Sequence, residues 1–359
     1  MATLFSELEY AAPYNERVGL INAAIDLARS LGDRTILSTV LNRFCLTSAV
    51  PHNLQARLEA SSESLALGLG DRSLEFWALC GSCLAGVGTG DLDRAISCLD
   101  AMTRLAVDTG RPSFHWVTTN VRCSLTSALG DNARLESLAS QSLALGTEAG
   151  EPDAFDFFTV LIMTARRAQG RAGEILEQLL EIAAKNPSIE AYTAVAAMFL
   201  SREGQPERAR ALLDDAKDRN FEVDLTNSWA ATTCSWAQAA SELGDTDACA
   251  ILYRLLSPHA GQISCHMTFC DSSIDGVLGH LALVLDQPEK AEAHFAASEL
   301  TTTEFGAHFF AANDDLARAT LHRRLGDHHQ ANIYLDRTTK VAQANGYKSI
   351  ERRARSMVE

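Results

Sequence analysis

Apolar side chains recur three and four positions apart along most of this chain, with polar residues between them. The segments 210–219 (RALLDDAKDR) and 291–300 (AEAHFAASEL) show this spacing clearly. Because an α-helix completes a turn every 3.6 residues, such spacing places the apolar groups on one helical face. Short breaks at glycine or asparagine, followed by acidic residues or by Gln-Pro, separate these segments. The pattern predicts a series of amphipathic helices joined by tight turns.

The breaks form two interleaved series with nearly constant steps. Glycine suits the left-handed conformation that ends many helices, and an acidic residue after it suits the N-cap of the next helix. The first series advances by 40, 40, 34, 40, 42 and 40 residues, through Gly90, Gly130, Gly170, Gly204, Gly244, Asp286 and Gly326. The second series contains Gly32, Gly70, Gly110, Gly150, Asn186, Asn220, Gly261, Gly306 and Gly346, and its largest step, before Gly306, is 45 residues. Each unit is predicted to be a helix, a tight turn and a second helix, and the units are predicted to stack.

Three positions in fixed register with the first series carry the side chains that closely packed antiparallel helices need. Residues seven before and five after each break are mostly small, which lets the helices approach, and residues nine after it are mostly large. The small sets are Cys83, Cys123, Met163, Ala197, Ala237, Gly279 and Ala319, then Ala95, Leu135, Ile175, Ala209, Cys249, Ala291 and Ala331. The large set is Leu99, Ala139, Leu179, Leu213, Tyr253, Phe295 and Leu335. All three sets are predicted to be buried.

Composition and charge narrow the classes of function. The 359 residues carry 31 basic and 46 acidic side chains, a net charge of −15, which repels nucleic-acid phosphates and anionic membrane surfaces. The N-terminal residues 1–19 show no signal-peptide pattern, and no apolar run approaches the ~18 residues of a membrane span. The nine cysteines are scattered through helical segments. They are expected to be free thiols in a reducing cytoplasm, so the predicted location is cytoplasmic.

The segment 278–295 (LGHLALVLDQPEKAEAHF) resembles a tetratricopeptide repeat, with Leu278-Gly279 in its first helix and Ala291 and Phe295 in its second. The spacing of about 40 residues exceeds the ~34 of the standard repeat. It resembles the variant in the C-terminal sensor regions of large bacterial signalling ATPases, including maltose-regulator-like transcription activators and adenylate-cyclase-linked ATPases. Residues 227–327 carry this resemblance most closely, and a weaker match begins near residue 17. The resemblance implies a sensor-like module for ligand or protein binding.

The chain departs from those large proteins in two respects. It contains no GxxxxGK[ST] phosphate loop, and its end (ERRARSMVE) shows no basic helix-turn-helix. We therefore do not expect this chain to share the ATPase and DNA-binding activities of those large proteins. We expect an all-α fold: a single right-handed α-solenoid of TPR-like repeats over 1–359, with about eight helical pairs and caps at 1–16 and 340–359.

The inner wall of such a superhelix is the predicted binding groove. The register of the standard repeat places a mixture of polar, charged and large apolar side chains on this wall. They are Trp77, Asn120, Ser124, Phe157, Thr164, Arg167, Arg202, Cys234, Gln238, His280, Asn313 and Arg323. Such a mixture suits a protein segment or a small amphipathic effector. A solvated wall without a specific ligand is the competing interpretation.

Few residues point to catalysis or metal binding. Cys80-Gly-Ser-Cys83 has dithiol spacing but lies within a predicted helix, where packing is the favoured role. Cys265-His266 with Cys270 lacks a second paired motif, so no metal and no cofactor are predicted. Asp271 and Asp275 would share one helical face, yet Asp271 also suits a helix start. These cysteine and aspartate patterns therefore favour packing and helix capping over catalysis or metal binding.

Three hypotheses follow from these observations. The leading one is a binding module that uses the concave groove. The alternative is an enzyme on the same scaffold, with acid/base chemistry from Asp271, Asp275, His280 and His266. The third is self-association, with a homodimer formed through the solenoid ends.

Overall fold

The computed structural model describes residues 12–47 and 49–357, and the chain is 80% helical with almost no sheet. The predicted all-α class is confirmed. The described part of the first half contains α2 (Tyr14–Leu31), α3 (Arg34–Thr47), α4 (Leu54–Ala66), α5 (Arg72–Thr89), α6 (Leu92–Thr109), α7 (Pro112–Leu129), α8 (Asn132–Ala149) and α9 (Ala154–Gln169). Next come α10 (Leu176–Lys185), α11 (Glu190–Arg202), α12 (Pro206–Asp218), α13 (Trp229–Leu243) and α14 (Thr246–Leu256). The remainder comprises β1 (Ile263–Cys265), β2 (Cys270–Ser273), α15 (Ile274–Val284), α16 (Pro288–Phe305), α17 (His308–Arg324), α18 (His328–Asn345) and α19 (Lys348–Ser356).

The predicted breaks are the turns between helices. Every glycine in the two series has a positive φ, as do Asp286 and Asn220; Asn186 is the exception, with φ −126°. The residue after Gly90 shows how a turn starts the next helix. Asp91 accepts a hydrogen bond from the backbone N–H of Arg94, and so caps α6. The predicted turns are therefore confirmed except at Asn186, and the predicted acidic N-cap is confirmed after Gly90, Gly130, Gly244 and Gly326.

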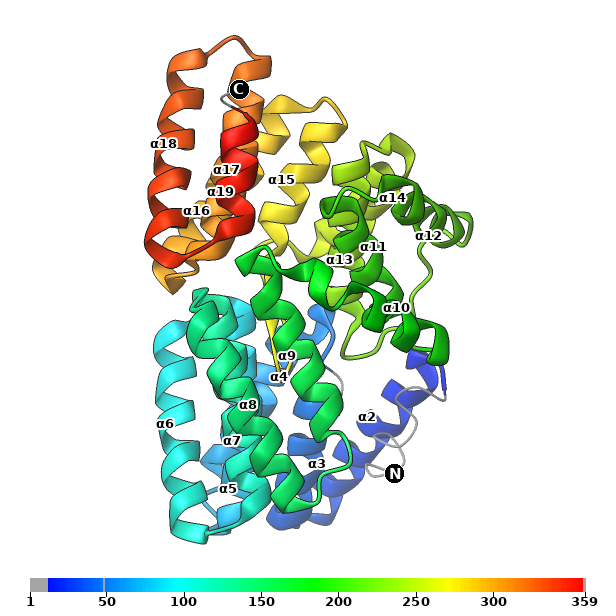
Figure 1. Cartoon of the computed structure of the whole chain (residues 1–359). Coiled ribbons are helices and arrows are strands. Elements are labelled where there is room, and N and C mark those ends of the chain that lie inside the picture. The colour runs from blue at the N-terminus through cyan, green and yellow to red at the C-terminus, as the bar shows by residue number, and fades with distance from the viewer. Residues whose placement is uncertain (1–11, 48, 358–359) are drawn as a thin grey trace.

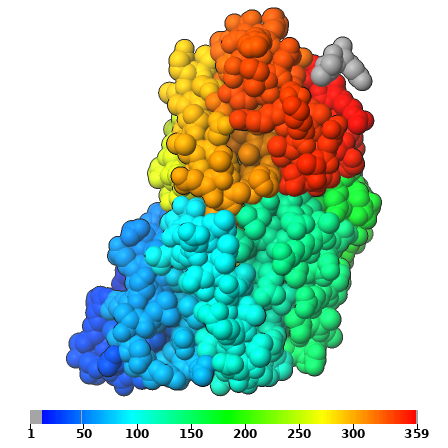
Figure 2. Space-filling model, turned by 90° about the vertical axis from the view of Figure 1, so that its left-hand side faces the viewer, coloured from blue at the N-terminus to red at the C-terminus, as the bar shows by residue number. Residues whose placement is uncertain are grey.

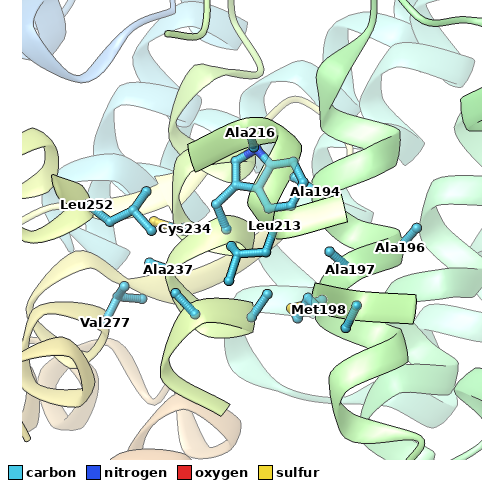
Figure 3. Packing of buried hydrophobic residues seen from close by; sticks show 14 of the residues in the cluster. Ala194, Ala196, Ala197, Met198, Leu213, Ala216, Cys234, Ala237, Leu252 and Val277 are labelled. Atoms are coloured by element: carbon cyan, nitrogen blue, oxygen red, sulfur yellow. The ribbon is translucent and has the colours of Figure 1, made fainter. Parts of the chain in front are cut away.

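The three predicted packing sets are buried throughout, except for Tyr253, which is half-buried. The pair Gly279 and Phe295 shows why the small positions are small. A Cβ atom on Gly279 of α15 would lie 2.5 Å from the Phe295 ring of α16. Small side chains also allow α11 and α13 to approach each other. Ala197 and Ala237, one on each of these helices, are fully buried in the cluster drawn in Figure 3. Small side chains therefore set the distance between paired helices.

The helices form two tiers joined by a side arm (Figures 1 and 2). Helices α3–α9 make one tier, α15–α19 stand end-on to it, and α10–α14 connect them at the side. Contacts between α7 and α17 and between α9 and α19 close the junction. Tyr347 lies in this junction with its hydroxyl against Gly130 and its ring edge-on to Phe309, 5.1 Å between centroids. Residues far apart in the sequence thus meet at this junction, and next to it lie two cavities lined by residues of both tiers and of the side arm, which we together call the hollow.

A β-hairpin in the hollow is the main departure from the predicted helices. Strands β1 and β2 pair antiparallel, and Cys265 lies opposite Cys270. Asp271 belongs to β2, and Ser273 is the residue whose side chain caps α15, accepting from Gly276 N. The prediction that Asp271 starts a helix and shares a helical face with Asp275 is therefore wrong.

The ends of the chain are only partly described. Residues 1–11 of the predicted N-terminal cap lie outside the described residues. The predicted C-terminal cap contains α19, which packs against α9 and α17. Over the ranges 12–47 and 49–357, no helix combines the length and apolar character needed to cross a bilayer.

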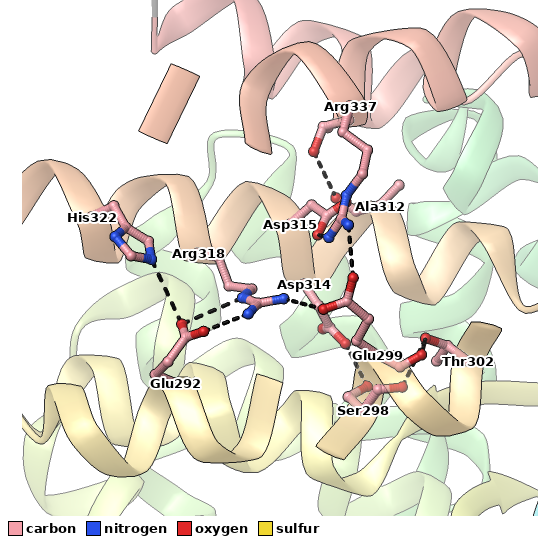
Figure 4. A network of polar contacts seen from close by, with 11 residues as sticks. Glu292, Ser298, Glu299, Thr302, Ala312, Asp314, Asp315, Arg318, His322 and Arg337 are labelled. Atoms are coloured by element: carbon pink, nitrogen blue, oxygen red, sulfur yellow. Dashed lines mark hydrogen bonds and ion pairs between the residues drawn. The ribbon is translucent and has the colours of Figure 1, made fainter. Parts of the chain in front are cut away.

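Charged side chains of α16, α17 and α18 contact one another in the second tier (Figure 4). Arg318 pairs with Glu292 and Glu299, and Arg337 pairs with Glu299 and Asp315. Each of the two guanidinium groups contacts two of the three carboxylates, so this network holds the three helices together.

Candidate functional site

The hairpin is tied to the inner wall of the hollow by three side chains. Ser124 of α7 donates a hydrogen bond to the carbonyl of His266 at 2.7 Å, and Ser127 accepts one from the backbone N–H of Cys270 at 2.7 Å. Arg167 of α9 donates to the carbonyl of Asp271 at 3.1 Å. Wall positions predicted to meet a foreign ligand therefore hold the chain's own hairpin, which divides the hollow.

An apolar cavity of about 300 Å³ lies on one side of the hairpin. Helices α9, α11 and α13 and the hairpin loop form its walls, with Arg167 and Asp271 also lining it. Its aromatic side chains come from three different elements. They are Phe157, Tyr192, Phe199 and Phe269. A cavity of this size and character accepts a small, largely apolar molecule.

A second cavity of about 440 Å³ has more charged and polar side chains in its lining than the first, and we call it the arginine cavity. It shares Arg167 and Asp271 with the apolar cavity. It also contains most of the predicted polar groove residues. They are Arg167, Arg202, Gln238, His280 and Asn313. The two cavities thus meet at one buried arginine and one buried aspartate.

The guanidinium groups of the arginine cavity outnumber the carboxylates that pair with them. Glu242 is shared by Arg202, at 3.4 Å, and Arg353, at 3.1 Å. Burial, together with the nearby charges of Arg353 and Arg167, lowers the pKa of Arg202 to about 10. Arg167 is 7% exposed, and its Nε has no hydrogen-bond partner among the described residues. A buried cation with an unpaired donor is costly, which makes this a place where a bound anion is favourable.

Asp271 supplies the opposite charge at the boundary between the cavities. Burial raises the pKa of this carboxyl to about 6, and the Ser264 hydroxyl and the Arg167 guanidinium oppose the rise only in part. The group therefore exchanges its proton close to neutral pH. A carboxyl group with such a pKa is suited both to ligand recognition and to proton transfer.

The remaining candidate acid/base residues are not gathered at one point. His266 lines the apolar cavity, and burial lowers its pKa to about 4, so its imidazole is neutral. His280 lines the arginine cavity, with Nε2 3.6 Å from Asp314. Asp275 lines neither cavity; it pairs with His294 at 2.8 Å, whose Nε2 lies 2.9 Å from the hydroxyl of Tyr253. The four predicted acid/base residues thus form no single catalytic cluster.

Several predicted groove residues also lie away from a cavity wall. Asn120 is fully buried and accepts a hydrogen bond from Ser142 of α8. Trp77 packs edge-on against Phe76 and Phe114, and Arg323 donates to the carbonyl of Met357. Cys234 is buried within the core cluster that includes α13. Phe157 and Thr164 do line the apolar cavity, as expected for wall residues.

The predicted dithiol motif Cys80-Gly-Ser-Cys83 lies in the buried part of α5. Cys80 and Cys83 are fully buried one turn apart in α5, and burial raises the pKa of Cys80 to about 12, as expected for packing residues. All nine cysteines fall among the described residues, and each is a free thiol. Nowhere in residues 12–47 or 49–357 do three or more His, Cys, Asp or Glu side chains form a group placed to hold a metal ion.

Sequence analysis did not identify several residues of the site. Tyr192, Phe199 and Phe269 line the apolar cavity, and Arg353 reaches the arginine cavity from the predicted C-terminal cap. One signal was present for the hairpin. The step from Gly261 to Gly306, 45 residues instead of about 40, contains the inserted strands.

Searches against protein-family models and against curated proteins find no match to this chain, so the inferred function rests on its own geometry.

Proposed function

We propose that this chain is a helical-repeat binding module of the sensor type, a right-handed α-solenoid with a period of about 40 residues, whose hollow binds a small amphipathic anion. The observation that carries the proposal is Arg167. Its guanidinium is buried, its Nε is unpartnered, and it stands where an apolar and a polar cavity meet. A ligand with an apolar body and an acidic group would satisfy both.

The apolar cavity accounts for the body of the ligand. Its volume of about 300 Å³ is at the lower end of ordinary small-molecule sites. Tyr192 and Phe199 from α11 face Phe269 of the hairpin across a space lined mostly by carbon. Rings or a short alkyl chain would displace water from apolar surface there, which is favourable by about 25 cal/mol per Å².

The arginine cavity accounts for the acidic group. Arg167, Arg202 and Arg353 all line it, and Glu242 is the one carboxylate that forms ion pairs with two of them. Guanidinium groups bind planar carboxylates and phosphates through paired N–H donors. A bound carboxylate, sulfonate or phosphate would relieve the mutual repulsion of these cations in a protein whose net charge is otherwise −15.

A fluorescence titration with anilinonaphthalene sulfonate, an aromatic amphipathic anion, tests the proposal. We expect one binding site in the hollow and a raised midpoint of thermal unfolding, because the probe binds the folded form. Val195→Trp fills the apolar cavity and should abolish this binding. The matched control is Val107→Trp, which adds the same ring at a side chain that is 66% exposed. Equal affinity of the two variants would refute the proposed site.

Charge is tested separately. Arg353→Gln removes one guanidinium from the arginine cavity, and we expect about tenfold weaker binding, the loss of roughly 1.4 kcal/mol. Arg72→Gln is the control, because Arg72 pairs with Asp108 on the exposed surface. If Arg353→Gln binds the probe as tightly as the native chain does, and Val195→Trp still abolishes binding, the hollow contains an apolar binding site. The proposal that it recognises an anion would then be refuted.

The raised pKa of Asp271 favours a second candidate, an enzyme that carries out acid/base chemistry on the molecule bound in the hollow. Mass spectrometry of the ligand retained by the purified protein tests it. Different chemical forms in the native chain and in Asp271→Asn would support turnover. The same form in both would exclude Asp271 as the acid or base.

A further inference from the structure

Two thiol groups face each other across the hairpin. Cys265 at the end of β1 lies opposite Cys270 at the start of β2 in the antiparallel register. Both sulfur atoms contact the same hydroxyl, that of Ser124, at 3.3 Å and 3.4 Å. The register is irregular between Ser264 and Cys265, so it is the contact of both sulfurs with one hydroxyl that places them close together. The two sulfurs therefore lie close enough to bond after a small rotation of each side chain.

The two cysteines differ in access and in acidity. Cys265 is partly exposed and lines a small cavity of about 40 Å³ together with Arg57, whereas Cys270 is fully buried. A hydrogen bond from the Cys270 thiol and the charge of Arg57 lower the pKa of Cys265. Burial raises the pKa of Cys270. Cys265 is thus the attacking thiolate, and Cys270 is the resolving thiol beside it.

We propose that Cys265 and Cys270 are an oxidation site at which hydrogen peroxide forms a disulfide bond within the hairpin. The cavity beside Cys265 has room for peroxide but not for a peptide disulfide. The Cys265 thiolate attacks one peroxide oxygen, the O–O bond breaks, and the departing hydroxide takes a proton to become water. Cys270 then attacks the resulting sulfenic sulfur, and a second water leaves. Two thiols and one peroxide give one disulfide and two waters.

The bond would join the strand ends that position both cavities. His266 follows Cys265 and lines the apolar cavity, and Asp271 follows Cys270 and lines both cavities. The proposal does not depend on a ligand in the hollow, because the thiols and the oxidant are the only reactants.

Peptide mapping of the full-length protein tests the proposal. The folded, reduced chain is treated with one equivalent of hydrogen peroxide, denatured, alkylated and digested with trypsin. Cleavage after Arg254 and Lys290 yields peptide 255–290, whose cysteines are Cys265 and Cys270 alone. We expect this peptide to escape alkylation and to be two hydrogens lighter, and to accept two alkyl groups if it is reduced first. A peptide with both thiols alkylated after peroxide treatment would overturn the proposal.

The chain supplies its own control. Peptide 73–94 contains Cys80 and Cys83, which are nearer to each other in sequence than Cys265 and Cys270 but are held in a buried helix. We expect it to remain alkylatable in the folded protein and to oxidise once the protein is unfolded in urea before treatment. Equal oxidation of both peptides in the folded protein would show that sequence proximity, not the hairpin, directs the reaction, and would overturn the proposal.

Single variants assign the two roles. Cys270→Ser should leave a sulfenic acid on Cys265 that dimedone captures, whereas Cys265→Ser should yield no adduct on Cys270. A dimedone adduct on Cys270 alone would reverse the assignment and contradict the geometry. The native-chain mapping stands even where a variant folds poorly.

Discussion

Replacing Asp271 by asparagine tests the electrostatics of the hollow directly. The pKa of this carboxyl is about 6 in the folded chain and 3.8 without the fold. An acid whose folded pKa is raised contributes full stability below its unfolded pKa and loses it as the pH rises through its folded pKa. About two pKa units, at roughly 1.4 kcal/mol each, make ionised Asp271 cost about 3 kcal/mol at pH 8. Asp271→Asn removes that cost and keeps the shape of the side chain.

Urea unfolding of both chains between about pH 4 and pH 8 measures the effect. The variant should gain about 2–3 kcal/mol relative to the native chain as the pH rises across this range. Any constant cost of burying the amide cancels when the pH 8 and pH 4 differences are subtracted. Asp26→Asn, at an exposed position of α2, is the control and should show no such trend. A difference between the native chain and Asp271→Asn that stays flat with pH would refute the argument that burial dominates this group.

Two further predictions concern packing, and a third concerns a buried hydroxyl group. Gly279→Ala should destabilise the chain by about 1–2 kcal/mol, because overpacking against Phe295 outweighs the better helix propensity of alanine. Gly19→Ala, in α2 with nothing within 4 Å of the added carbon, should instead stabilise the chain by about 0.5–1 kcal/mol. Shifts of the denaturant midpoint in opposite directions would confirm both predictions, and a lower midpoint for Gly19→Ala would contradict them. Tyr347→Phe should leave stability unchanged or raise it by up to about 1 kcal/mol, because the buried hydroxyl has no hydrogen-bond partner in the part of the chain that the structure describes. Calorimetry showing a loss above about 1 kcal/mol would mean that this hydroxyl makes a hydrogen bond in solution.

The free-energy cost of burying the charged groups of Asp271 and Arg167 also bears on function. Both groups are buried with incomplete pairing, and apolar residues would make the hollow more stable. Proteins retain such groups mainly where a ligand or a reaction needs them. We therefore place the candidate site at the boundary of the two cavities and not at the network of Figure 4, whose charged groups contact one another.

The sequence by itself determined the local structure of this protein. Left-handed turns at positions such as Gly90, caps such as Asp91 and the close pair of Gly279 and Phe295 were all predictable. Each depends on residues within about 20 positions of one another, where backbone geometry and side-chain size leave few alternatives.

Tertiary structure alone decided the site. The hairpin occupies the hollow because Ser124 and Arg167 bind it across more than 100 residues of sequence. Arg353 belongs to the arginine cavity because α19 folds back onto α9, a contact that no periodicity encodes. Local turns place each helix against its neighbour in sequence, whereas contacts such as those of α9 with α19 and α7 with α17 bring together residues that are far apart in the chain. The character of each helix is therefore local, whereas the chemistry of the hollow follows from how the whole chain curves and closes.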